Sequence, residues 1–376
     1  MKGLFALGSA DIIGLSITSV FWLYLSTIME VEQYGELHYF ISIAGIAAVI
    51  CLVGAKDVIV VYTAKNVKVQ PILFLLSFLA SGVVFVVIAI FFRMDIGFLL
   101  LGYIINELAT GYLLGKKQFV NVSKYVLIQK TLLVVVGFGF FHLFGLEGII
   151  YGFALSYIHL LIIIFQVLRK PEFNFKVVSE HKGFIINNYV MAIVVSFRGH
   201  LDKIIIVPLL GFTSLGNYSL VLQIFSIMTV FEGILFKYIL PNDAAGIPNL
   251  KLKKYAIVVA ICISMLGVFV IPFFIPIVFP KYTEAVDMLR IISFAVIGTT
   301  FVKIYMSKLL GMEKSRFVLY GRTVALLVTI IGILILAPML NTIGLAITFV
   351  LSAAAHAITL IYFDRRYVQG TNHVKG

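Results

Sequence analysis

The feature that most constrains this chain is a nearly continuous succession of apolar runs, each close to the length that a bilayer-spanning helix needs. A hydrocarbon core requires roughly 20 apolar residues per helix. Charged residues or Gly, Pro and Asn breaks separate the runs. The pattern predicts about twelve spans, at 8–29, 36–63, 71–92, 95–115, 118–143, 148–168, 183–211, 214–238, 254–279, 285–308, 316–338 and 341–363.

Composition supports an all-α polytopic membrane protein. Hydrophobic residues make up 61% of the 376 residues and charged residues only 12%, which is too little polar material to cover a water-soluble domain of this size. The first run has no small-residue cleavage site after a short apolar region, so it is interpreted as a retained span. Cys51 and Cys262 both lie in apolar runs, which predicts neither a disulfide framework nor a metal site, and no cofactor is expected.

The net charge of +12 is unevenly distributed among the connecting segments. Basic residues collect in alternate connections, whereas the opposite set holds only Arg93 and Lys281 beside several acids. With an even number of spans, this asymmetry predicts that both termini are cytoplasmic. It also makes the positive charge a topology signal, so no nucleic-acid partner is expected. The predicted location is the cytoplasmic membrane, as a multi-pass protein and a monomer.

The two halves of the sequence repeat. LLGKK at Leu113–Lys117 matches LLGME at Leu309–Glu313, and GIIYGFALS at Gly148–Ser156 matches GLAITFVLS at Gly344–Ser352, both with a shift of 196 positions. Six spans return a chain to its starting side, so the copies are predicted to be parallel repeats, with a substrate site between them. The expected domains are an N-terminal six-helix lobe (1–170), a cytoplasmic linker (171–182) and a C-terminal six-helix lobe (183–376).

The stretch from Ser196 to Val221 holds the densest group of charges inside an apolar run: Arg198, Asp202 and Lys203. A charge at bilayer depth costs a few kcal/mol or more, so such residues need a protein or water lining. One interpretation is an Arg198–Asp202 pair at i,i+4 that neutralises itself. The other is a polar translocation path.

Further ionisable residues lie inside apolar runs. Lys130 is predicted near mid-bilayer, where its amine cannot easily reach an interface, so a position facing a polar lumen is favoured. Arg322, Lys124 and Lys303 lie nearer the predicted cytoplasmic ends and can also extend to the interface. Because basic groups exceed acidic ones at depth, an anionic, phosphate-bearing substrate is favoured. The candidate substrate-binding residues are Lys130, Arg198, Asp202, Lys203, Arg322, Lys124 and Lys56.

Three acidic residues are candidates for ion coupling: Glu107, Glu232 and Asp57. Each is either a proton or cation site or a partner of a lysine, and Lys56 and Asp57 are adjacent and can neutralise one another. No nucleotide-binding or hydrolase motif occurs in a supporting context. The sequence therefore indicates a carrier and not an enzyme.

Several segments resemble one family. EQYGELHYFISI from Glu32, LDKIIIVPLLGFTSLGNYSLV from Leu201 and FPKYTEAVDMLRIISF from Phe279 are similar, in this order, to polysaccharide-transport proteins. These belong to the multidrug/oligosaccharidyl-lipid/polysaccharide flippase superfamily. Asp202 matches a position where that family usually has Asp.

The resemblance implies a flippase of the O-antigen exporter type that moves a polyprenyl-diphosphate-linked oligosaccharide from the cytoplasmic to the outer leaflet by alternating access. Its partners would be the lipid-linked oligosaccharide, membrane lipids, and glycosyltransferases or a polymerase of the same pathway. Two alternatives stay open. A cation-coupled multidrug exporter of the same superfamily would need an acidic cavity, and a membrane glycan polymerase would need a sizeable outer loop.

Overall fold

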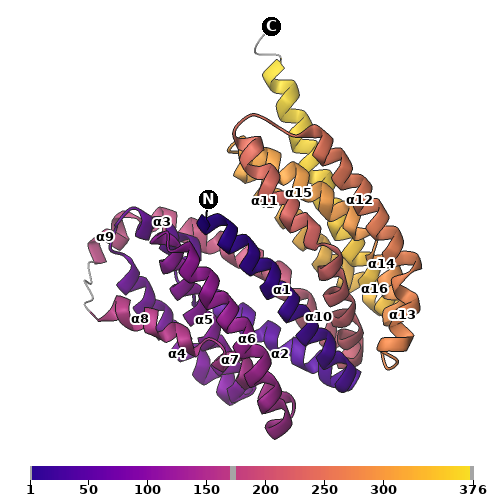
Figure 1. Cartoon of the computed structure of the whole chain (residues 1–376), viewed down its shortest axis with the longest axis horizontal. Helices are drawn as coiled ribbons and strands as arrows, with labels where there is room; N and C mark the ends of the chain where they lie inside the picture. Colours follow the sequence, from indigo (N-terminus) through magenta and orange to yellow (C-terminus); the bar gives the residue numbers. More distant parts are fainter. Residues whose placement is uncertain (1, 170–174, 373–376) are drawn as a thin grey trace. The chain divides into compact units, whose positions relative to one another are not determined.

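The computed structural model describes residues 2–169 and 175–372, which contain helices and no strands (Figure 1). Helices of the first half are α1 (Lys2–Ile28), α2 (Val31–Cys51), α3 (Ala55–Ala64), α4 (Gln70–Phe91), α5 (Met94–Gly115), α6 (Phe119–Phe144), α7 (Leu146–Leu155), the 3₁₀ turn η1 (Ile158–Leu160), α8 (Leu161–Leu168) and α9 (Phe175–Glu180). Those of the second half are α10 (Lys182–Met228), α11 (Val230–Ala244), α12 (Leu250–Phe269), α13 (Ile271–Val278), α14 (Ala285–Ile292), α15 (Ala295–Gly311) and α16 (Ser315–Asn372). Helices satisfy every backbone group internally, as hydrocarbon demands.

The predicted number of spans is confirmed within the described residues. Ten helical segments are long and apolar enough to cross a membrane. Two of them, α10 and α16, contain a residue with non-helical backbone angles, Gly211 and Asn341 respectively. Dividing each at that residue gives twelve spans, and the chain is a multi-pass membrane protein.

Both breaks follow a proline by three positions. Pro208 precedes Gly211 (φ 79°), and Pro338 precedes Asn341 (φ 51°). A proline lacks the N–H of the helical ladder, and glycine and asparagine are the residues that enter left-handed backbone most readily. Each proline and the glycine or asparagine three positions later therefore mark the end of one helix, and the next helix begins directly after them.

The chain forms two compact units. The first comprises residues 1–24 and 39–200, and the second comprises 25–38 and 201–376. This grouping differs from the predicted lobes at two segments. Residues 25–38 pack with the second unit, and 183–200 pack with the first. The predicted linker 171–182 lies partly outside the described residues.

Helix ends repeat between the halves. Lys117 and Glu313, 196 positions apart, have φ of 58° and 60°. Each closes its helix with the same pair of backbone hydrogen bonds: Lys117 N to Leu114 O with Gln118 N to Leu113 O, and their counterparts 196 positions later. This is the Schellman arrangement, in which a left-handed residue satisfies the last carbonyls.

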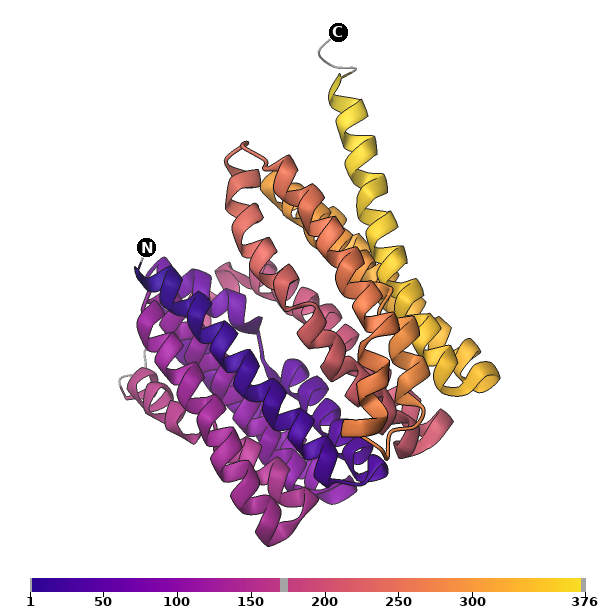
Figure 2. The same ribbon diagram turned by 45° about the vertical axis from the view of Figure 1, so that its right-hand side comes forward.

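Close glycine contacts repeat as well. A side chain at Gly148 would overlap the carbonyl of Phe140, and one at Gly344 would overlap that of Leu336, again 196 positions later. These glycines close the α6–α7 hairpin and the hairpin inside α16 (Figure 2). The repeated bundles predicted from the sequence are therefore present in the fold.

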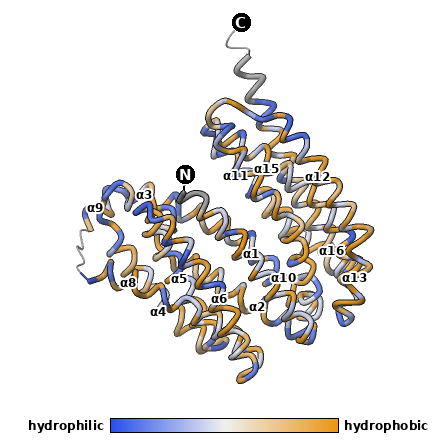
Figure 3. Tube along the Cα trace, viewed as in Figure 1, coloured by the Kyte–Doolittle hydropathy of each residue, from blue (hydrophilic) through white to orange (hydrophobic). Residues whose placement is uncertain are grey.

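Polar residues gather at helix ends, with apolar stretches along the helices (Figure 3). The few cations that the sequence places on the predicted outer side meet acids there. In the first unit, Arg93 lies 2.7 Å from Asp95 and 3.5 Å from Glu147. In the second unit, Lys281 lies 2.7 Å from Glu30. This pairing leaves little net positive charge at those ends, as the predicted topology requires.

Candidate functional site

A buried acid–base pair lies on α10 in the second unit. Lys203 Nζ is 3.5 Å from Oδ1 of Asp202, and their side chains are 14% and 8% exposed. The hydroxyl of Tyr218, in the part of α10 that follows the Gly211 break, donates a hydrogen bond to Oδ2 of Asp202 at 3.1 Å. Two of the predicted substrate-binding residues thus form a hydrogen-bonded pair whose charges cancel. Arg198, one turn earlier on α10, is half-buried.

Three aromatic side chains form a layer in the second unit: Tyr34 and His38 from α2, and Tyr282 from the connection between α13 and α14. The Tyr34 ring lies 4.6 Å from the His38 ring and 6.1 Å from that of Tyr282, centroid to centroid. His38 is within electrostatic reach of Lys203. The hydroxyl oxygens of Tyr34 and Tyr282 are buried, and neither forms a hydrogen bond with any residue that the structure describes. The only sequence signal for this layer is the Tyr34–His38 spacing of four, which places both on one helix face.

Glu232 on α11 is the most deeply buried of the predicted ion-coupling acids, at 2% exposure. Its Oε1 accepts hydrogen bonds from Thr299 Oγ1 at 2.7 Å and Thr300 Oγ1 at 3.0 Å, both on α15. One turn further along α15, Lys303 Nζ lies 5.5 Å from the ring centroid of Phe236. The two threonine hydroxyls and the nearby Lys303 are polar partners in the second unit that can stabilise the Glu232 side chain either as a carboxylate or in its protonated form.

In the first unit, Lys56 on α3 lies 3.5 Å from Glu107 on α5, and about a third of each side chain is exposed. The amide of Asn106 donates to the same carboxylate at 3.2 Å. Lys56 therefore has its described ion-pair partner on another helix, while its chain neighbour Asp57 is exposed. Glu107 thus lies next to a lysine, and its role in ion coupling stays a prediction.

Lys130 differs from these paired lysines. It is the twelfth of the 26 residues of α6, and its side chain packs against Gly14 of α1, where an added Cβ would lie 3.4 Å from Lys130 Cγ. Within the described part of the chain, no acid lies within ion-pair distance of its amine. A half-buried lysine in mid-span without an acid is costly.

The remaining candidates lie apart from these groups. Arg322 on α16 is half-buried and contacts the sulfur of Met306 on α15 at 3.8 Å. Lys124, on the second turn of α6, is exposed. The structure therefore groups the candidates into a Lys56–Glu107 pair in the first unit and an Asp202–Lys203 pair in the second, with Lys130, Arg322 and Glu232 at separate positions. Their roles stay predictions.

Comparison with known proteins gives a likeness of fold. No protein-family model matches the sequence, and no curated protein matches it. Among solved structures, the inward-facing conformation of a multidrug resistance MATE family transporter of the MOP superfamily covers 100% of both chains with a TM-score of 0.79 at 14% identity. The chain has the fold of MOP superfamily transporters.

The same MOP fold accommodates proteins described in different terms. A MOP superfamily transporter from Pyrococcus furiosus Vc1, described by a reverse polarity of its binding pocket, matches with a TM-score of 0.64 and 17% identity over 98% of this chain and 96% of its own. The lipid II flippase MurJ matches with a TM-score of 0.62 and 13% identity over 96% of this chain and 81% of its own. The fold alone therefore does not determine the substrate, so the inference about the substrate must rest on the charged residues of this chain.

Proposed function

We propose that this protein is an alternating-access flippase that moves a lipid-linked oligosaccharide, carried on a polyprenyl diphosphate, from the cytoplasmic to the outer leaflet for cell-surface polysaccharide synthesis. The proposal combines the MOP fold with the sequence resemblance to polysaccharide-transport proteins. A neighbour of this fold, MurJ, is named a lipid II flippase. The membrane would be the cytoplasmic membrane.

The observation that carries the proposal is Lys130. A mid-span amine without an acid in the described residues is stabilised when an anionic group of a substrate approaches it, and phosphate is a strong partner for lysine. Arg322, whose described contact is only a methionine sulfur, adds a second cation of this type in the other unit. The paired lysines, Lys56 and Lys203, contribute polar lining with less net charge.

Ion coupling is assigned to the second unit, at Glu232. Both threonine hydroxyls donate to Oε1 of Glu232, and the other carboxylate oxygen can carry a proton. A buried acid of this kind binds and releases a proton as its surroundings change from wet to dry. Glu107, already bridged to Lys56, is the weaker candidate, and the exposed Asp57 the weakest.

A multidrug exporter is the second candidate, because the structural neighbour with the highest TM-score among those given above is a multidrug resistance transporter. Cationic drugs require an acidic cavity, so that function would depend on Glu232 and Asp202. Lys203 neutralises Asp202, and this disfavours cation binding there.

The test reconstitutes the purified protein in liposomes with a fluorescent polyprenyl-diphosphate oligosaccharide and measures its transfer between leaflets with a membrane-impermeant quencher. We expect transfer well above that of protein-free liposomes. A parallel assay follows uptake of a cationic dye under a proton gradient. Dye transport without movement of the lipid would replace the flippase proposal with the exporter.

A further inference from the structure

The connection between α13 and α14 (279–284) contacts the beginning of α2 within the second unit. Lys281 Nζ lies 2.7 Å from Oε1 of Glu30, and the two side chains are 40% and 66% exposed. The adjacent Tyr282 ring lies 6.1 Å from the Tyr34 ring, centroid to centroid, and both of these side chains are buried. An exposed ion pair and a buried ring contact therefore join the α13–α14 connection to the beginning of α2.

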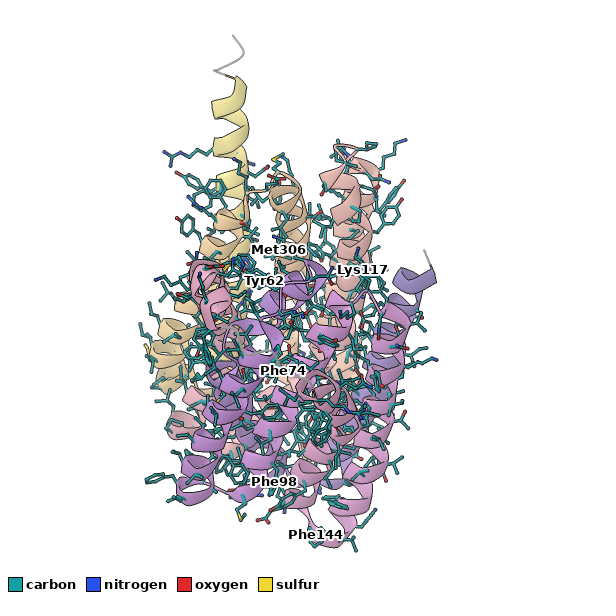
Figure 4. The ribbon with its side chains drawn as sticks, turned by 90° about the vertical axis from the view of Figure 1, so that its left-hand side faces the viewer. Tyr62, Phe74, Phe98, Lys117, Phe144 and Met306 are labelled. Carbon is teal, nitrogen blue, oxygen red and sulfur yellow. The ribbon has the colours of Figure 1, made fainter. Side chains whose placement is uncertain are left out.

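This contact lies on the predicted outer side of the protein. Within the first unit, Lys117 lies towards one end of the helices, and Phe98 and Phe144 lie towards the other (Figure 4). Lys117 belongs to a basic connection, and Phe144 stands three positions before Glu147, so the two ends carry the charges that the topology predicts. By the same alternation of spans, Lys281 belongs to an outer connection.

The contact joins the two sequence repeats. Residues 25–38 belong to the first half of the chain, and they are grouped with the second half in the second unit. Alternating access proceeds by rocking or gating of one repeat against the other. A contact between the repeats on the outer side can therefore act as a gate.

The closed contact leaves two buried hydroxyls without a hydrogen bond. The hydroxyl oxygens of Tyr34 and Tyr282 have no hydrogen-bond partner among the residues that the structure describes. Buried polar groups in native proteins are nearly always hydrogen-bonded, and a buried donor without a partner is destabilising. Water that enters an opened contact would hydrogen-bond both hydroxyls. The two hydroxyls therefore favour opening, whereas the Lys281–Glu30 ion pair favours closure.

A row of polar side chains leads inwards from this contact. The Tyr34 ring lies 4.6 Å from the ring of His38, one turn further along α2. His38 is within electrostatic reach of Lys203, whose Nζ is 3.5 Å from Oδ1 of Asp202. Opening at Tyr34 would therefore give water from outside a polar route to the buried Asp202–Lys203 pair.

Three prolines provide a place to bend beside the connection. Pro272 lies in the first turn of α13, Pro276 lies inside α13, and Pro280 lies in the connection itself. A proline removes one hydrogen bond of the helical ladder, and sharp bends of helices concentrate at prolines. The chain that leads to Tyr282 is therefore held by fewer backbone hydrogen bonds than an ordinary helix.

We propose that the α13–α14 connection is an outer gate, and that it opens a polar path from outside to Asp202 and Lys203. The hydroxyls of Tyr34 and Tyr282 set the balance between its closed and open forms. The gate rests on the alternating access of the proposed function, and it does not depend on which substrate is carried.

The test measures distances between pairs of spin labels by double electron–electron resonance, with the protein in lipid nanodiscs and both native cysteines replaced. The gate pair carries labels at Glu32→Cys in α2 and Glu284→Cys in the connection, both exposed positions. The control pair carries labels at Thr213→Cys and Met339→Cys, which are exposed positions in the second half of the chain and outside the connection.

We expect the gate pair to show a short and a long distance, and the control pair to show one. Tyr34→Phe/Tyr282→Phe removes both hydroxyls and should raise the ratio of closed to open molecules about five-fold or more. Lys281→Gln removes the ion pair and should lower that ratio about two-fold. Tyr320→Phe, at an exposed ring of the same unit, should leave the ratio unchanged.

A single short distance for the gate pair, with and without Lys281→Gln, would overturn the gate. Two distances for the control pair would also overturn it, because the movement would then not belong to the connection. An unchanged or lowered ratio in the double phenylalanine variant would overturn the role of the hydroxyls. Neither lipid transfer nor dye uptake is measured, so failure of the gate is distinguishable from failure of the proposed function.

Discussion

Lys130 is the residue on which the assignment of an anionic substrate depends most. Its amine sits in mid-span with no acid within ion-pair distance in the described chain, so it is free to meet a phosphate. The charge is expensive to hold there, and removing it should not destabilise the fold. Lysine and arginine share the charge, although arginine presents it in a planar fork.

We therefore predict that Lys130→Ala lowers lipid transfer in liposomes at least ten-fold, a loss of about 1.4 kcal/mol or more in transition-state stabilisation. Lys130→Arg should retain a substantial part of the activity. The melting temperature of Lys130→Ala in detergent should equal or exceed that of the wild type. Full activity of Lys130→Ala would remove this residue from the substrate site.

We expect the charge of Asp202 to stabilise the fold. Its carboxylate joins Lys203 and the Tyr218 hydroxyl in a buried group. Removing the acid would leave a buried cation without this partner, so we predict that Asp202→Ala destabilises the protein by about 3 kcal/mol. Tyr218→Phe, which deletes one hydrogen bond to a charged group, should cost about 1.5 kcal/mol.

Denaturation in mixed micelles measures both changes, and the double variant Asp202→Ala/Tyr218→Phe should be less destabilised than the sum of the two. Additive effects would show that the Tyr218 hydroxyl and the Asp202 carboxylate do not interact.

At this scale the sequence predicted which charges lie inside the apolar runs but not which of them meet. Lys56 has Asp57 next to it in the chain, yet it bridges to Glu107, 51 positions away. Adjacent residues on a helix point in different directions, so partners depend on how helices pack. For the same reason the layer of Tyr34, His38 and Tyr282 was not predicted, because it combines α2 with the distant connection between α13 and α14.

At the scale of elements, the most specific packing is a reciprocal crossing of α2 and the second part of α10 within the second unit. A side chain at Gly35 would overlap the carbonyl oxygen of Phe212, and one at Gly216 would overlap that of Val31. Gly35 and Gly216, like Val31 and Phe212, are 181 positions apart, so each half contributes the same two positions. Small residues let membrane helices approach to backbone contact.

A substitution at this crossing should destabilise the protein far more than a substitution at a glycine with open space around it. We predict that Gly35→Ala and Gly216→Ala each lower the melting temperature by several degrees, because the Cβ forces two backbones apart. Gly82→Ala in α4 is the matched control, since no atom lies within 4 Å of its added Cβ, and it should be neutral or stabilising. Equal melting temperatures for all three variants would contradict the crossing.

Element boundaries were largely predictable, and the reason is chemical. Pro208 with Gly211 and Pro338 with Asn341 both mark a helix end followed by a new start. The grouping of residues 25–38 and 183–200 was not predictable from chain order. It depends on glycine contacts such as that between Gly35 and Phe212, whose partners are far apart in the sequence.

At the scale of the whole molecule, an even number of spans and the one-sided distribution of lysines make a topological prediction. Both termini, and the connections after Gly115 and Gly311, should face the cytoplasm. Single cysteines introduced at Lys117 and Glu313 in a background lacking Cys51 and Cys262 should react with a membrane-impermeant maleimide only after cells are opened. A cysteine at Glu147 or Glu284 should react in intact cells.

Labelling of Lys117→Cys in intact cells would contradict the topology and, with it, the direction of transport. The fold class and the number of spans followed from hydropathy because hydrocarbon permits few other structures. The substrate did not follow from the fold, since proteins described as a multidrug transporter and as a lipid II flippase share it with this chain at 13–14% identity.

We propose that a MOP fold with an unneutralised mid-span cation moves a lipid diphosphate sugar between leaflets. The most direct measurement is the leaflet transfer of a fluorescent polyprenyl-diphosphate oligosaccharide in liposomes containing wild-type protein or Lys130→Ala. We expect transfer by the wild type and at least a ten-fold loss in the variant. Transfer that is no faster than in protein-free liposomes, or that is unchanged by Lys130→Ala, would contradict it.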